Sequence, residues 1–140
     1  MPEKILFVSS KETVGISLAL YNGEDIFKLD NAKNIDTLYN YLSHEEIDKI
    51  GFYKQYEEPK VLALANELMI PVISVSDIIE NSFPTDILPA DTININNTAN
   101  YIGIKDKSSD EAFLTAQIYR KVIFKKEQEI SYCKKIRTHK

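Results

Sequence analysis

Three consecutive strand patterns at the start of the chain limit the folds open to it more than any other feature. Lys4 to Ser9 is a short apolar run rich in β-favouring residues, which is typical of a strand buried on both faces. Gly15 to Tyr21 then places an apolar residue at every second position. The next dipeptide, Asn22-Gly23, accepts the two positive φ angles of a type I′ turn, so Glu24 to Leu29 is predicted to return antiparallel.

Helices and short strands alternate in the segment that follows. Apolar residues at positions i, i+3, i+4 and i+7 predict a helix from about Ala32 to Leu42. Pro59 is suited to a first helical position and opens a second helix over Lys60 to Met69, which Pro71 ends. The remaining elements are two strands and one short helix: Ile47 to Tyr53, Val72 to Val75 and Asp77 to Asn81.

The predicted order β-β-β-α-β-α-β-α is that of one α/β lobe of the actin-like (ASKHA) and RNase H-like architecture, with a mixed five-stranded sheet. We expect residues 1–82 to form this lobe and residues 83–140 to form a reduced C-terminal lobe with a helix and a basic tail. In the second lobe, 92–96 and 101–105 are predicted as short strands. Ser109 is predicted to cap a helix that runs to about Lys126.

Length, composition and charge bound the class of protein. A chain of 140 residues can build one ordinary core, and no apolar run approaches the roughly 18 residues that a membrane span needs. The first residues also lack the apolar segment of a secretory signal, and the single cysteine, Cys133, forms no CxxC pair. These features predict a cytoplasmic protein that has no membrane contact.

The basic residues are concentrated at the C-terminal end. Residues 120–140 hold eight Lys and Arg against two Glu, a net charge of +6, whereas the whole chain carries -4. A cationic tail on an anionic body can reach a polyanion or an acidic protein, although such tails are also commonly only solvated. Within this tail, Lys134, Lys135 and Arg137 are the candidates for contact with RNA.

Two stretches resemble the TsaB (YeaZ) family of tRNA-modification proteins. The opening ILFVSSKETVGISLALYNGEDIF is similar to the family's first strand and hairpin. The stretch IDKIGFYKQYEEPKVLALANELMIPVISVSDIIEN is similar to its strand, loop, helix and "iPligVStL" segment, with Pro71, Val75 and Ser76 in matching places. The resemblance covers about residues 4–81. It implies the ASKHA lobe and a non-catalytic subunit that binds and supports TsaD, the ATP-using enzyme that puts threonylcarbamoyl on the adenosine beside the anticodon.

The resemblance also implies other binding partners. TsaE is a further partner in the assembled complex, and the first two helices of relatives pair with those of TsaD or of a second copy. A weak or indirect contact with tRNA would go through Lys134, Lys135 and Arg137.

Two departures from the family pattern weigh against a nucleotide site. The family has a glycine-rich loop before its second helix, and this chain has Tyr53 to Pro59 there, including Glu57 and Glu58, which would repel an anion. Ser9 stands at the end of the first strand, where the wider fold often places a metal-positioning Asp. We therefore expect no cofactor, no metal site and no catalytic residues. His44 and His139 also lack the spacing of paired metal ligands.

The expected partner surface follows from the apolar residues of the two helices. In the second helix, four apolar residues already supply a stripe for the sheet, and Leu62 and Met69 lie off it. Tyr41 is similarly off the stripe of the first helix. Clustered apolar groups outside a core often mark interfaces. Together with Leu38, these residues form the predicted partner-binding set.

Two other functions stay open on the sequence alone. One is an unrelated protein-interaction module of the same fold, because a fold does not fix a function. The other is an ASKHA kinase or an RNase H-like nuclease, which the missing glycines and the missing strand-borne Asp disfavour.

Overall fold

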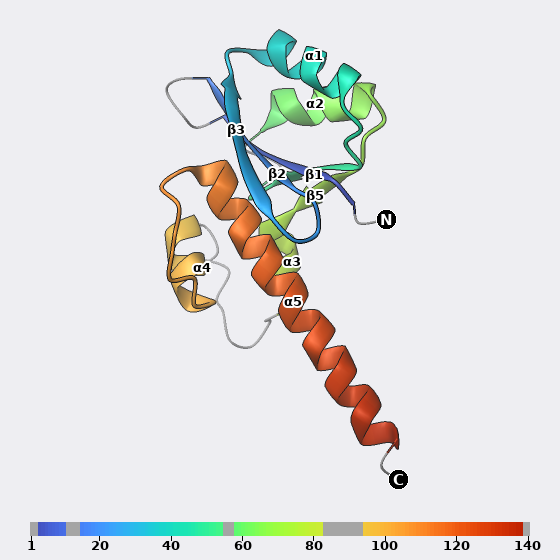
Figure 1. Cartoon of the computed structure of the whole chain (residues 1–140). Helices are drawn as coiled ribbons and strands as arrows, with labels where there is room; N and C mark the ends of the chain where they lie inside the picture. The colour runs from blue at the N-terminus through green and yellow to red at the C-terminus, as the bar shows by residue number, and fades with distance from the viewer. Residues whose placement is uncertain (1–2, 11–14, 55–57, 83–93, 139–140) are drawn as a thin grey trace.

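The protein contains a mixed five-stranded sheet with helices on both faces (Figure 1). The computed structural model describes residues 3–10, 15–54, 58–82 and 94–138, without the side chains of 82 and 125–138. Its strands are β1 (Ile5–Ser9), β2 (Ile16–Tyr21), β3 (Ile26–Ala32), β4 (Lys49–Phe52) and β5 (Val72–Ser74). Its helices are α1 (Ile35–His44), α2 (Pro59–Glu67), α3 (Val75–Ser82), α4 (Ile95–Tyr101) and α5 (Glu111–Thr138).

The sheet order β3-β2-β1-β4-β5 confirms the predicted fold class. β1 pairs antiparallel with β2 and parallel with β4, and β3 and β5 form the two edges. The elements up to α3 follow the order β-β-β-α-β-α-β-α, which is typical of an RNase H-like or ASKHA lobe. The central strand β1 is buried along its whole length, as its continuous apolar run predicts.

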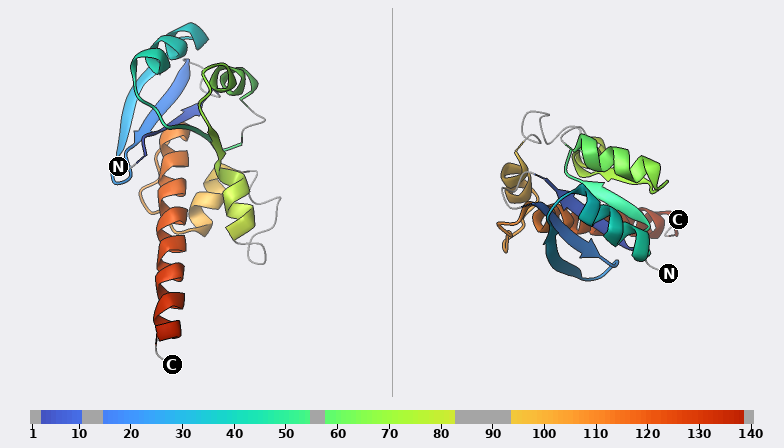
Figure 2. Two further views of the ribbon diagram at one scale, coloured as in Figure 1. Left: turned by 90° about the vertical axis from the view of Figure 1, so that its right-hand side faces the viewer. Right: turned by 90° about the horizontal axis from the view of Figure 1, so that it is seen from above.

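Side chains of β1 alternate between two hydrophobic clusters, one on each face of the sheet. Leu6 and Val8 pack with α1 and α2, whereas Ile5 and Phe7 pack with α3, α4 and α5. Figure 2 shows α1 and α2 on one side of the sheet and the long α5 on the other, with α3 and α4 beside it. Phe7 also explains a glycine in β4, because a Cβ on Gly51 would lie 2.4 Å from the Phe7 ring.

The hairpin between β2 and β3 differs from the predicted type I′ turn. The pair Tyr21 and Ile26 closes a four-residue loop, in which Gly23 has a positive φ of 99° and Asn22 does not. The Asn22 side chain instead accepts hydrogen bonds from the backbone N–H groups of Glu24 and Asp25, at 2.9 and 2.8 Å. Asn22 therefore forms an Asx turn, the local competitor of the tight turn that the dipeptide suggested.

The helices α1 and α2, which lie on the same face of the sheet, begin close to their predicted positions. Asn34 caps α1, because its side chain accepts from the Thr37 N–H, so α1 starts at Ile35 and not at Ala32. Pro59 opens α2 as predicted, but α2 ends at Glu67. Met69 lies beyond that end with a φ of 57°. Its N–H bonds the Asn66 carbonyl, and the Ile70 N–H bonds the Ala65 carbonyl, which together form a Schellman C-cap.

The second half of the chain differs most from its prediction. The segments 92–96 and 101–105 do not form strands in the described residues, since α4 runs from Ile95 to Tyr101. Asn94 accepts hydrogen bonds from the N–H groups of Asn96 and Asn97 and so starts a helix where alternation suggested a strand. Helix α5 is capped by Asp110, not Ser109, and extends past Lys126 to Thr138. Its C-terminal half runs beyond the sheet (Figure 1).

The described part of residues 83–140 shares a core with the first 82. Leu114, Ile118 and Val122 of α5 join Phe7 and Tyr21 of the sheet in one cluster of buried residues. Tyr119 contacts both aromatic rings, with centroid distances of 5.5 Å to Phe7 and 6.0 Å to Tyr21. Helix α5 is therefore a layer on the sheet rather than part of a separate lobe. No helix in the described parts of the chain is long and apolar enough to span a bilayer.

Candidate functional site

A hollow of about 510 Å³ lies at the carboxyl end of β1, where ligands bind in many α/β sheets. Ser10 follows β1 into it, Asn34 and Ile35 bring the start of α1, and Glu58 and Lys60 bring the start of α2. The hollow lies where the strand directions change, because β1 has an antiparallel neighbour on one side and a parallel one on the other. This is the place at which the fold could hold an anionic ligand on two helix N-termini.

The carboxylate of Glu58 binds the end of β1 inside this hollow. One oxygen accepts the Ser10 backbone N–H at 2.9 Å, and the other accepts the Ser10 hydroxyl through a short contact. Only 5% of Glu58 is exposed. Sequence reasoning identified Glu58 as a repelling loop residue, but nothing in the sequence indicated its partner 48 positions away.

This contact determines what the hollow can do chemically. A bound phosphate would need backbone N–H donors at the strand end, and the Glu58 carboxylate already uses the one that Ser10 presents. An anion entering here would also meet a fixed negative charge. Pro59, at the first position of α2, removes one more N–H donor. Within the described residues, no group of three His, Cys, Asp or Glu is placed to hold a metal ion.

The predicted partner-binding residues fall into three environments. Leu38 is fully buried in the cluster between α1 and the sheet, so its assignment to a partner surface was wrong. It lies on the inward face of α1, on the stripe that packs against the sheet. Tyr41 and Leu62 are half-buried against the same cluster. Met69 is 88% exposed, yet it belongs to the C-cap of α2 and does not share a helical face with Leu62.

The environment of Tyr41 raises the pKa of its hydroxyl. Partial burial, and then the nearby Glu45 carboxylate, raise the pKa of Tyr41 above its ordinary value of 10.0. A neutral tyrosine with an apolar ring and one polar tip suits a position at the edge of a contact surface.

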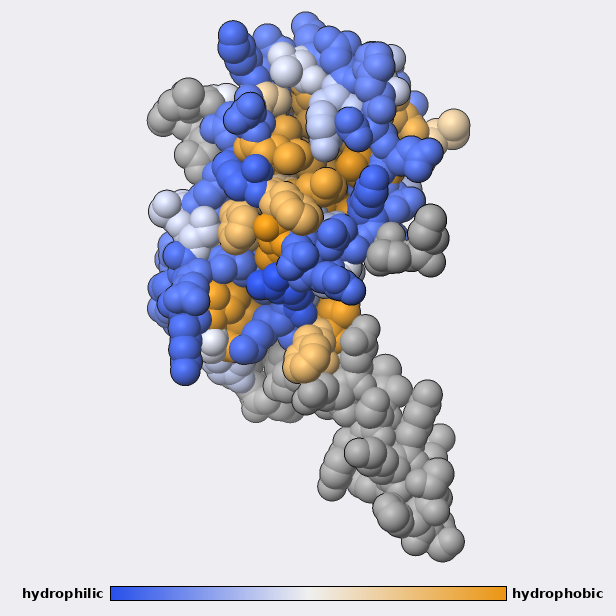
Figure 3. All heavy atoms as spheres, in the orientation of Figure 1, coloured by the Kyte–Doolittle hydropathy of each residue, from blue (hydrophilic) through white to orange (hydrophobic). Residues whose placement is uncertain are grey.

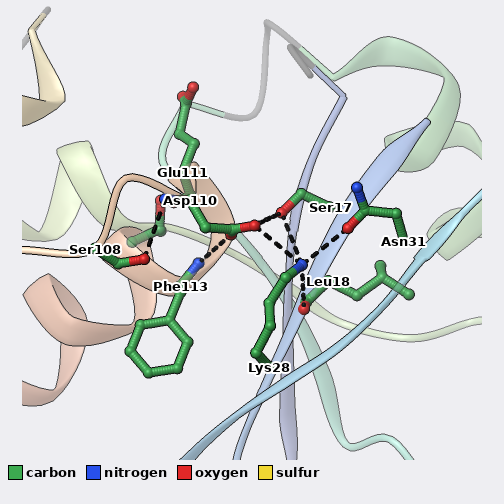
Figure 4. A network of polar contacts seen from close by, with 9 residues as sticks. Ser17, Leu18, Lys28, Asn31, Ser108, Asp110, Glu111 and Phe113 are labelled. Atoms are coloured by element: carbon green, nitrogen blue, oxygen red, sulfur yellow. Dashed lines mark hydrogen bonds and ion pairs between the residues drawn. The ribbon is translucent and has the colours of Figure 1, made fainter. Parts of the chain in front are cut away.

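A polar network fixes the other face of the sheet (Figure 4). The Asp110 carboxylate accepts from the buried Ser17 hydroxyl at 2.7 Å and from the Phe113 N–H at 3.0 Å, and it pairs with Lys28 at 3.0 Å. Burial alone would raise the pKa of Asp110, but the hydrogen bonds from Phe113, Ser17 and Lys28 and the Lys28 charge together lower it. The network joins β2, β3 and the start of α5. These contacts hold the three elements together, which is a structural role.

The basic residues predicted to contact tRNA lie on α5. Lys134, Lys135 and Arg137 belong to this helix, but their side chains fall outside the described ones, so their contact with tRNA stays a prediction. Ser9, expected in the place of a metal-positioning Asp, has a buried hydroxyl without a hydrogen-bond partner among the described residues.

Comparison of the chain with protein families, with curated proteins and with solved structures found no match.

Proposed function

We propose that this protein is a non-catalytic, TsaB-like subunit that binds and supports a TsaD-like enzyme in the threonylcarbamoylation of tRNA. Three features of the chain support the proposal: the sheet order, the family-like segments between residues 4 and 81, and the partly or fully exposed apolar side chains of Tyr41, Leu62 and Met69. The observation that carries it is Met69, which combines 88% exposure with a left-handed backbone. Residues other than glycine that are held in the left-handed region cluster at functional sites, and the exposed side chain of Met69 is accessible to a partner.

The proposed contact residues are Tyr41 and Leu62, which are half-buried against the same cluster, together with Met69 beyond the end of α2. A half-buried Leu62 and Tyr41 would lose their remaining water contact on association, and Met69 would supply a flexible apolar side chain that adapts to the partner. The same surface would serve pairing with a second copy of the chain when the partner is absent. TsaE would join only in the assembled complex.

The test is co-purification with the TsaD-like protein of the same organism. A Met69→Asp variant should keep its fold, because the side chain is exposed, and should lose the partner through an unpaired charge in the contact. Leu62→Asp should cost about 3 kcal/mol of binding, with circular dichroism to show that the half-buried position still permits folding. Asn97→Asp on α4 is the control, since Asn97 is exposed on the other face of the sheet and should retain the partner.

The alternatives give different results in the same experiment. If the protein is instead an interaction module of the same fold that serves another partner, TsaD should not co-purify with the native chain or with any of the variants. A folded Met69→Asp variant that retains TsaD as the native chain does would exclude this surface.

A further inference from the structure

A second hollow, of about 560 Å³, lies on the opposite side of the sheet, between α5 and the segment that joins α4 to α5. The joining segment is held along α5 by Gln117, whose side chain donates to the Asp106 carbonyl at 2.8 Å and accepts from the Ser108 N–H at 3.1 Å. These two hydrogen bonds hold the joining segment against α5, so the two sides of the hollow are tied to each other. Figure 3 shows this part of the body as mainly hydrophilic, with small hydrophobic areas.

Three cationic side chains line this hollow: Lys105, Arg120 and Lys121. Gln117, Arg120, Lys121 and Phe124 fall at i, i+3, i+4 and i+7 and so share the outward face of α5. Lys105 faces them from the joining segment, and among the described residues of the lining Asp106 is the one acidic side chain. Arg120 also donates to the Glu24 carbonyl at 3.2 Å, which ties its guanidinium to the loop between β2 and β3.

Phe124 sets this hollow apart from an ordinary basic surface. It is 59% exposed and is the last residue of α5 whose side chain is described, one turn beyond Arg120 and Lys121. A phenylalanine exposed to this extent loses apolar burial, and next to cations it offers a flat surface on which a nucleobase can stack.

We propose that this hollow binds single-stranded nucleic acid, with a base stacked on Phe124 and the backbone phosphates held by Lys105, Arg120 and Lys121. An unpaired strand fits better than a duplex, since stacking needs a free base face, and one aromatic with three cations accommodates a stretch of only a few nucleotides. The site differs from the α1–α2 surface and does not depend on any TsaD-like partner.

The test measures fluorescence anisotropy of labelled oligo-U and oligo-dT of about 12 nucleotides with the full chain, from roughly 50 to 200 mM salt. Three phosphate contacts predict a slope of log K against log salt of about -2. Phe124→Ala should weaken binding about tenfold at every salt concentration, and Lys121→Ala should make the slope shallower by about 0.7. The two probes decide between RNA and DNA.

Two matched variants show whether the effects belong to this hollow. Phe27→Ala removes an aromatic ring that is 48% exposed on β3, and Lys33→Ala removes an exposed lysine between β3 and α1. Both should bind as the native chain does. The proposal is overturned if the native chain shows no saturable binding, if a duplex of equal length binds more tightly, or if Phe124→Ala binds as strongly as Phe27→Ala.

Discussion

Among the described residues other than glycine, Met69 is the one with a positive φ. It occupies the position after a helix at which glycine is most common. A left-handed backbone costs a residue with a Cβ about 1 kcal/mol or more, and the exposed Met69 side chain recovers little of this by packing. Met69→Gly is therefore expected to raise the free energy of unfolding by about 1 kcal/mol. Urea denaturation followed by circular dichroism measures the change as a higher midpoint at unchanged slope.

Glu67→Gly provides the matched control, two positions earlier at the end of α2 and also exposed. Glycine in a helical position lowers stability by about 1 kcal/mol, so the two substitutions should have opposite signs. A Met69→Gly variant that is no more stable than the native chain would show that the methionine makes a stabilising contact. In that case Met69 would need no partner to account for it.

At the scale of an element, Asp110 connects the start of α5 to the sheet. Asp110→Ala removes a helix cap and leaves the fully buried Ser17 hydroxyl without its acceptor, at a cost of about 2 to 3 kcal/mol. Asp110→Asn keeps an acceptor oxygen and should lose about 1 kcal/mol. Chemical denaturation at neutral pH measures both. Asp106→Asn, four residues earlier and exposed, is the control and should be neutral.

The same network gives a pH dependence with a defined sign. The pKa of Asp110 is lowered from its ordinary value of 3.8 in the folded protein, so the carboxylate stabilises the fold above that value. This contribution is lost as the pH falls through the lowered folded pKa. The stability difference between the native chain and Asp110→Asn should therefore be constant near neutrality and shrink at acidic pH. A difference that stays constant down to acid unfolding would contradict the role of the charge.

Elements that rest on local patterns were predictable, and those that rest on distant partners were not. The run from Ile5 to Val8 specified a doubly buried strand, and Pro59 placed the start of α2 correctly. The segment 92–96 was predicted as a strand, but Asn94 caps α4 instead, and this helix depends on Thr98 and Ala99 finding a buried place beside α5. The length of α5 was likewise underestimated, because the charges after Lys126 suggested a loose tail.

At the scale of the whole molecule, the candidate site was predictable only in part. Glu58 was predicted to repel an anion, and that stays a prediction; its bond to Ser10 joins two loops that only the fold brings together. Leu38 was assigned to the surface although the same apolar period that identified its helix also placed it in the core. Patterns along the chain specify which face of an element is apolar. They do not specify how much of that face its neighbours cover.

The contact between Glu58 and Ser10 also predicts how the isolated protein treats nucleotides. A triphosphate at the carboxyl end of β1 would have to displace the Glu58 carboxylate from the Ser10 N–H, and the displaced charge would remain in the same hollow of about 510 Å³. We expect calorimetric titration with ATP and magnesium to give no saturable heat in the micromolar range. Glu58→Gln removes the charge while keeping an acceptor for Ser10, so a site that appears only in this variant would identify the carboxylate as the block. Saturable micromolar binding by the native chain would overturn the assignment of this hollow as closed to anions, and with it the non-catalytic function.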